Sequence, residues 1–208
     1  MHFPFPMKTP LLPALALALA LAAAVQAAVP RRPNLLLVFT DDQRWDAMGV
    51  VQREHGDHAR FPWLRTPHMD RLAAEGVRFR NAFVTLSLCA PSRAVFMTGR
   101  YNHLNGIANN RTPFPADSVT HSTLLRPAGY VTAYIGKWHM GEDNDEPRPG
   151  FNWFVTHKGQ GKYFDTEFNL NGTRREVVKG YYTHVVTGMA EDWLRRDRKS
   201  TRLNSSHT

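Results

Sequence analysis

Residues 34–40 (Asn-Leu-Leu-Leu-Val-Phe-Thr) form a nearly continuous apolar run. Such a run is typical of a central strand that is covered on both faces of its sheet. The run ends at Asp41 and Asp42, so two carboxylates follow a predicted buried strand at its carboxyl end, where α/β sheets usually place their ligands.

Helical and strand patterns alternate along the rest of the chain. Thr66 and Pro67 favour the start of a helix and Gly76 favours its end, with Leu72 and Ala73 expected to face inward. The other predicted elements are a strand over Val77–Val84, a helix over Thr120–Pro127, a strand over Tyr130–Gly136, short hairpins within 141–180 and an amphipathic helix over Tyr182–Arg196. This alternation of strands and helices predicts an α/β fold with a largely parallel sheet.

Cys89 is the only cysteine among the 208 residues. Pro91 can occupy the first turn of a helix, where its missing N–H costs nothing, and Gly99 can end that helix. Cys89 is therefore predicted at a helix N-terminus, where free N–H groups and the helix dipole favour an anion. A sulfur there, with Arg93 four residues later, is typical of a reactive site. The alternative interpretation is a small buried apolar residue.

Lys137 and His139 follow the predicted strand over Tyr130–Gly136. Residues two apart on a strand point the same way, so an ammonium and an imidazole are expected to face one pocket. The ammonium can bind an anionic oxygen, and the imidazole can move a proton near neutral pH. Trp138, between them, is predicted to point into the core. The alternative is a strand end exposed to water.

Asp41 and Asp42 are candidate metal ligands. Adjacent carboxylates repel each other unless a cation holds them, and such hard oxygen ligands suit Ca²⁺ or Mg²⁺. The alternative is a turn or a helix cap, which is the more common role of two neighbouring aspartates.

Two segments resemble the signatures of the type I sulfatases. The first is Cys-x-Pro-Ser-Arg (89–93), followed by Thr-Gly-Arg (98–100), and the second is Gly-Lys-Trp-His-Met-Gly (136–141). The resemblance implies an α/β fold of the alkaline-phosphatase-like sandwich type with a central largely parallel sheet, present only as an N-terminal fragment. No Gly-x-Ser-x-Gly motif of a serine hydrolase occurs in the sequence.

The same resemblance implies the site chemistry. A separate formylglycine-generating maturation enzyme would oxidise Cys89 to Cα-formylglycine, whose hydrated form is the nucleophile. Asp41, Asp42 and the modified Cys89 would hold a divalent cation, Ca²⁺ with Mg²⁺ as the alternative. Arg93 would hold the formylglycine, Lys137 a sulfate oxygen, and His139 would orient the diol or move its proton.

The implied function is removal of sulfate from a sulfated glycan or a small sulfate ester. Segments 101–106, 112–115 and 159–164 look most like bacterial glycan sulfatases, especially N-acetylglucosamine-6-sulfatases. Two other interpretations remain open at this point. One is a phosphonate or phosphodiester hydrolase of the same superfamily, and the other is a non-catalytic cationic glycan-binding protein.

Three segments are expected along the chain. Residues 1–27 are predicted to be a signal peptide, which implies a periplasmic or secreted protein without a stable membrane anchor. Residues 28–196 are predicted to be the N-terminal part of a sulfatase catalytic domain, truncated because the later metal ligands of the family have no match in 142–196. Residues 197–208 resemble a translated sequencing adapter. Because the later ligands of the family are missing, we expect this polypeptide alone to be inactive.

The charge and the remaining polar residues add weaker indications. Without residues 1–27 and 197–208 the net charge falls from +8 to +5, a mild excess that suits polyanionic substrates but is no signature of nucleic-acid binding. His103, Asn105 and residues 109–111 are weaker candidates for a substrate pocket, and ordinary loop residues are the alternative.

Overall fold

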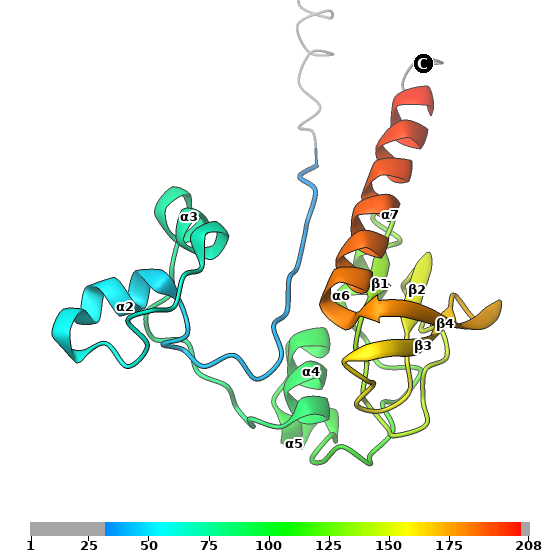
Figure 1. Ribbon diagram of the computed structural model, residues 1–208. Coiled ribbons are helices and arrows are strands. Elements are labelled where there is room, and N and C mark those ends of the chain that lie inside the picture. Colours follow the sequence, from blue (N-terminus) through cyan, green and yellow to red (C-terminus); the bar gives the residue numbers. More distant parts are fainter. Residues whose placement is uncertain (1–31, 205–208) are drawn as a thin grey trace, which may run out of the picture. The chain divides into compact units, whose positions relative to one another are not determined.

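The computed structural model describes residues 32–204 (Figure 1). The chain divides into two units between Gln43 and Arg44. Each unit is described by itself. The predicted signal peptide lies outside the described residues, and the predicted adapter-derived segment lies partly outside them.

Residues 34–40 are irregular and do not form the predicted strand. Leu36 and Val38 are 70% and 79% exposed, so the prediction of a buried central strand is wrong for the described structure. A strand forms only where a neighbouring strand takes up its backbone N–H and C=O groups. Within the described residues of this unit, 32–43, no neighbouring strand is available to pair with residues 34–40.

The unit that begins at Arg44 contains a four-stranded sheet within its described residues, in the order β1-β2-β3-β4 (Figure 1). The first two strands run parallel, with Tyr134 opposite Phe154, and the other two pairs are antiparallel. The α/β class is confirmed, with the parallel pairing of the described sheet confined to β1 and β2. The strands are β1 (Ala133–Ile135), β2 (Trp153–Thr156), β3 (Phe164–Leu170) and β4 (Arg174–Tyr181).

The hairpin of β3 and β4 confirms the hairpin expected within residues 141–180. Asn171 and Gly172 lie at its tip with φ of 57° and 71°, which suits the left-handed preference of these residue types. The strand expected over Tyr130–Gly136 is present but shorter, as β1.

Helices occupy much of the remaining described chain. They are α2 (Gly49–His55), the 3₁₀ helix η1 (Gly56–His58), α3 (Pro67–Glu75), α4 (Cys89–Thr98), α5 (Asn102–Asn105), α6 (His121–Leu125) and α7 (Tyr182–Asn204). The expected helices at Thr66–Gly76 and Thr120–Pro127 are confirmed as α3 and α6. Thr120 and Thr123 form a reciprocal capping box at the start of α6.

The expected last helix is also confirmed, because α7 begins at Tyr182. Val185, Val186, Met189 and Trp193 are half-buried along one of its faces. Its described residues therefore have the amphipathic character that the sequence predicts.

Two predictions about the segment after α2 are wrong. Leu72 of α3 is 68% exposed and does not face inward. Val77–Val84 is irregular rather than a strand, and Phe79 and Phe83 are 81% and 90% exposed. Alternating apolar residues form a strand only where a sheet pairs with them, and no described strand does so here.

The core lies between α4 and the start of the sheet. Trp138 is fully buried, as predicted, and its ring meets those of Phe154 and Tyr134 at centroid distances of 5.4 and 5.3 Å. Because the same core packs one face of α4 and the turn after β1, it fixes Cys89 and Lys137 relative to each other. The buried members are Ala90, Ala94, Met97, Ile107, Phe114, Trp138, Met140 and Phe154.

Candidate active site

Cys89 is the first residue of α4 and carries a free thiol, as the sequence predicts for its place at a helix N-terminus. Leu88 before it is extended, and Gly99 ends the helix with a φ of 65°. The Ala90 N–H donates to Asn110 Oδ1 at 3.0 Å, so a loop amide takes one of the free N–H groups beside the thiol. The thiol itself is half-buried.

Lys137 lies directly beside this thiol. Its Nζ is 3.4 Å from Cys89 Sγ and donates to Gln160 Oε1 at 2.8 Å. The residue is only 8% exposed, so its positive charge acts in a partly desolvated environment. The structure thus brings together two residues that the sequence assigned to one site, from an α-helix and from the turn after β1.

Arg93 lies one helical turn beyond Cys89 and is also buried. Its Nη1 donates to the Lys137 carbonyl at 2.7 Å, and the Tyr134 hydroxyl donates to the same oxygen. Arg93 therefore fixes the backbone of Lys137 in addition to placing a second positive charge near Cys89. The sequence analysis did not single out Tyr134, because a tyrosine within an apolar strand is usually interpreted as a core residue.

His139 is brought to the same region by a turn rather than by an extended strand. The strand ends at Ile135, Gly136 has a φ of 124° and His139 has a φ of 44°. The Trp138 N–H donates to the Thr156 hydroxyl at 3.0 Å. A side-chain oxygen of β2 therefore takes the place of the backbone carbonyl that would continue the pairing of β1 with β2. The expectation that Lys137 and His139 share one face of a strand is therefore wrong.

Burial, followed by the charge of Lys137, lowers the pKa of His139, and Arg93 contributes in the same direction. Glu142 opposes them, with Oε1 at 3.5 Å from His139 Nε2. Arg93 and Lys137 thus make this region positive, which suits an anionic group that presents several oxygens. The imidazole beside them is held towards its neutral form.

A second buried histidine, His157, lies behind this region. Its Nδ1 is 3.1 Å from the Lys158 carbonyl and its Nε2 is 2.9 Å from the Tyr182 hydroxyl. A carbonyl only accepts, so Nδ1 carries the proton and Nε2 accepts from Tyr182. Burial lowers the pKa of His157, with Lys137 among the further causes.

Gln160 is another residue of the site that sequence reasoning missed. It lies in a loop between Gly159 and Gly161, whose φ values are 49° and 74°. A Cβ at Gly161 would lie 2.5 Å from the His157 ring, so glycine lets the loop pass close over that ring. The quoted segment 159–164 contained Gln160, but nothing in its spacing indicates a contact with Lys137.

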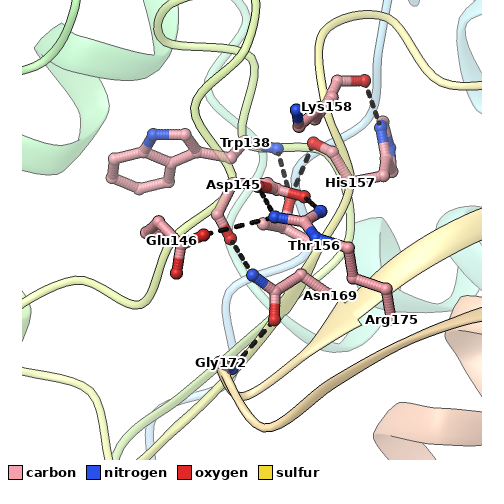
Figure 2. A network of polar contacts seen from close by, with 9 residues as sticks. All are labelled: Trp138, Asp145, Glu146, Thr156, His157, Lys158, Asn169, Gly172 and Arg175. Carbon is pink, nitrogen blue, oxygen red and sulfur yellow. Dashed lines mark hydrogen bonds and ion pairs between the residues drawn. The ribbon is translucent and has the colours of Figure 1, made fainter.

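A network of polar contacts anchors the loop after Gly141 to the β3–β4 hairpin (Figure 2). The Arg175 guanidinium contacts both oxygens of the buried Asp145 carboxylate, and it also contacts Glu146. Asn169 Nδ2 donates to the Asp145 carbonyl at 3.0 Å. These contacts fix the acidic loop that begins beside His139.

Asp41 and Asp42 belong to the unit described over residues 32–43, and Asp42 has a φ of 51°. Over residues 32–204, no group of three or more His, Cys, Asp or Glu side chains is placed to hold a metal ion. Two aspartates are a suitable donor set for Ca²⁺ or Mg²⁺, whereas an unmodified thiol is not. The predicted site on Asp41, Asp42 and Cys89 stays a prediction.

The weaker candidates have local structural roles. Asn105 Nδ2 donates to the Arg100 carbonyl at 2.9 Å, and the Asn109 side chain accepts from the N–H groups of Arg111 and Thr112. The exposed His103 ring stacks on Tyr101. Asn110 alone among them lies at the candidate site, through its bond to Ala90.

Among the described residues, no helix has the length and apolar character needed to cross a membrane.

The family model and the two relatives described next are those of sulfatases. The sulfatase family model matches residues 33–205. An N-acetylglucosamine-6-O-sulfatase of Bacteroides thetaiotaomicron is 38% identical over 194 residues, which cover 92% of this chain and 33% of that protein. A mouse steryl-sulfatase is 41% identical over 123 residues, covering 54% of this chain and 18% of its own length.

Solved structures agree with these relatives. A protein solved in complex with its substrate D-glucosamine-2-N,6-O-disulfate is 38% identical, with a TM-score of 0.70 over 79% of this chain and 31% of that one. The chain spans no more than about a third of the length of the relatives named here.

Proposed function

The chain belongs to the sulfatase family, and on this premise we propose that it forms part of a hydrolase that removes sulfate from a sulfated sugar. Its fold is the alkaline-phosphatase-like α/β fold of that family. The comparisons do not favour the phosphodiester-hydrolase and glycan-binding interpretations.

One observation in this chain carries the proposal. Lys137 Nζ lies 3.4 Å from Cys89 Sγ at the N-terminus of α4, with the guanidinium of Arg93 buried behind the Lys137 backbone. Two fixed positive charges and a helix N-terminus stabilise the charge that develops on a transferring sulfuryl group. Because these groups are held before substrate arrives, little reorganisation is needed during the reaction.

The modification of Cys89 to Cα-formylglycine supplies the nucleophile in this proposal. One hydroxyl of the hydrated aldehyde would attack sulfur and give up its proton, while the bond between sulfur and the ester oxygen breaks and the alcohol leaves with that oxygen and a proton. The second hydroxyl would then lose its proton, the C–O bond to the sulfate group would break, and sulfate would depart as the aldehyde is restored. His139 is the group assigned to that proton, because an imidazole with a lowered pKa is neutral and can accept it.

Asp41, Asp42 and the modified Cys89 would hold the divalent cation, Ca²⁺ or Mg²⁺. Conversion of the thiol to an oxygen-bearing group turns a soft ligand into a hard one, as these cations require. The bound cation would polarise a sulfate oxygen and lower the cost of forming the nucleophile.

The proposed substrate class is a sulfated amino sugar or a glycan that contains one. Two relatives support this class. One is an N-acetylglucosamine-6-O-sulfatase, and the other was solved in complex with its substrate, a disulfated glucosamine. A formylglycine-generating maturation enzyme is the proposed partner, and a periplasmic or secreted location follows from the predicted signal peptide.

The test has two parts, both made on protein from a host that contains a maturation enzyme. Mass spectrometry of the tryptic peptide Asn81–Arg93 should show an aldehyde in place of the Cys89 thiol. A longer polypeptide that carries this sequence and the later ligands of the family should release sulfate from glucosamine 6-sulfate, and its C89A variant should not. An unmodified thiol, beside a converted control sulfatase, would reject the proposed nucleophile.

A further inference from the structure

We propose that Glu142 is the carboxylate partner of His139, a positioning residue that holds the imidazole through Nε2 and leaves Nδ1 as the ring nitrogen that accepts a proton. The inference rests on the proposed function for its catalytic consequence only. The pairing itself is a property of this chain and can be measured without turnover.

The geometry of His139 requires a partner. The residue is 4% exposed, and neither Nδ1 nor Nε2 makes a hydrogen bond within the part of the chain that the structure describes. A buried imidazole N–H without an acceptor is costly. Glu142 Oε1 lies 3.5 Å from Nε2, slightly beyond a good hydrogen bond and within ion-pair distance. A small movement of the Glu142 side chain therefore brings Oε1 into hydrogen-bond distance of His139 Nε2.

The loop that carries Glu142 is held in place on both sides. Gly141 has a φ of 96°, and this turn brings Glu142 back beside the ring of His139 three residues earlier. Further along, Asp145 is fixed to Arg175 on the hairpin. The turn and the anchored carboxylate together limit where Glu142 can go.

The other carboxylate oxygen of Glu142 faces the loop of Gln160. A Cβ built at Gly159 would lie 3.1 Å from Glu142 Oε2, so the two loops are in close contact. Gln160, the next residue, accepts from Lys137 Nζ. Glu142 and Gln160 therefore flank the Lys137–His139 turn, and each contacts one of its two polar side chains.

The charged and titratable groups that face His139 come from its own turn and from two other elements. They are Lys137 in the same turn, Arg93 of α4 and, as a further titratable group, His157 after β2. Lys137 and Arg93 disfavour an imidazolium, whereas Glu142 favours it. Glu142 is thus the group that would balance the charge when His139 takes up a proton.

The chemical consequence is a fixed tautomer. With its Nε2–H directed at the carboxylate, neutral His139 has its lone pair on Nδ1. A proton from the second hydroxyl of the diol would pass to Nδ1, and the resulting imidazolium would be stabilised by Glu142. A carboxylate behind the imidazole performs the same orienting role in serine hydrolases.

The test compares E142Q with wild type in the full 208-residue chain labelled with ¹⁵N at histidine, using a His139 variant to assign the signals. We expect E142Q to lower the pKa of His139 and to reduce the population of the Nε2–H tautomer, and we expect E142D to restore both in part. The matched control is E146Q, because Glu146 is exposed and pairs with Arg175 instead. Identical His139 titrations in wild type and E142Q would overturn the inference.

A second measurement uses the longer, matured polypeptide. A general base acts in its neutral form, so a lower pKa moves the acid limb of the kcat profile to lower pH in E142Q. We expect kcat to fall about tenfold, a part of the roughly 10²–10⁴-fold that general acid–base catalysis contributes, with little change in KM. An unshifted acid limb rejects the role of Glu142, whereas a wild type without turnover rejects the proposed function and leaves the NMR result to decide the pairing.

Discussion

The ammonium of Lys137 lies 3.4 Å from the sulfur of Cys89, although the two residues are 48 positions apart in the chain. The contact exists because α4 and the turn after β1 pack on one aromatic core. It places a positive charge beside the residue that we propose becomes the nucleophile.

Replacing Lys137 by methionine should remove most of the proposed activity while keeping much of the side-chain volume. Loss of one preorganised charge stabiliser typically costs about 10²–10³-fold in kcat. Sulfate release by the matured longer polypeptide measures the effect. Lys158→Met is the matched control, because this nearby lysine is exposed and should leave the rate nearly unchanged.

Replacing Arg93 by alanine should destabilise the chain, besides any effect on catalysis. Arg93 is 8% exposed and its bond to the Lys137 carbonyl is buried, so its loss should cost about 1–3 kcal/mol in the free energy of unfolding. Urea unfolding of the 208-residue chain measures this. Arg195→Ala removes an exposed ion pair on α7 and should change stability by less than about 0.5 kcal/mol. Equal effects in the two variants would contradict the structural role of Arg93.

Breaking the Asp145–Arg175 pair should loosen the loop of Glu142. The Asp145 side chain is 1% exposed, so R175A leaves a buried carboxylate without its charged partner. We expect a loss of about 3–5 kcal/mol in the free energy of unfolding. The comparison variant is R174A, whose partner Glu176 lies on the surface. Hydrogen exchange should report faster opening of residues 141–146 in R175A only.

The free energy of unfolding should fall as the pH is lowered below about 6.5, partly because of His157. Burial lowers its pKa in the folded chain from an ordinary value of 6.5, so below that value the unfolded chain binds more protons. Above pH 7 both states are neutral and the contribution is constant. In H157Q the free energy of unfolding should change less steeply between pH 5 and 6.5. The substitution H184Q, at an exposed position, should leave this pH dependence unchanged. A slope that is identical in H157Q would mean that other groups cause it.

Removal of the divalent cation should abolish the proposed activity without unfolding this part of the protein. Chelation of the matured longer polypeptide should stop sulfate release, and added Ca²⁺ or Mg²⁺ should restore it. Asp42→Asn should weaken the restoration, because an amide is a poorer ligand for these cations than a carboxylate. Full activity after exhaustive chelation would reject the predicted site on Asp41, Asp42 and Cys89.

The sequence by itself determined the features that depend on neighbouring residues. Pro91 and Gly99 set the bounds of the Cys89 helix, and Thr120 with Thr123 begins α6, because caps and glycine conformations act within a few residues. The amphipathic pattern after Tyr182 likewise predicted α7. The two signature segments indicated the family that the comparisons then established.

Only the tertiary structure decided which segments become strands and which side chains meet. Residues 34–40 and Val77–Val84 have strand-like patterns, yet a strand needs a paired neighbour, and the pattern of one segment carries no information about its neighbour. The contacts of Lys137 with Gln160 and of His139 with Glu142 arise from tight turns at glycines with positive φ. Such turns change the direction of the chain, so the spacing of residues along the sequence does not show which side chains they bring together. The local sequence therefore could not predict these two contacts.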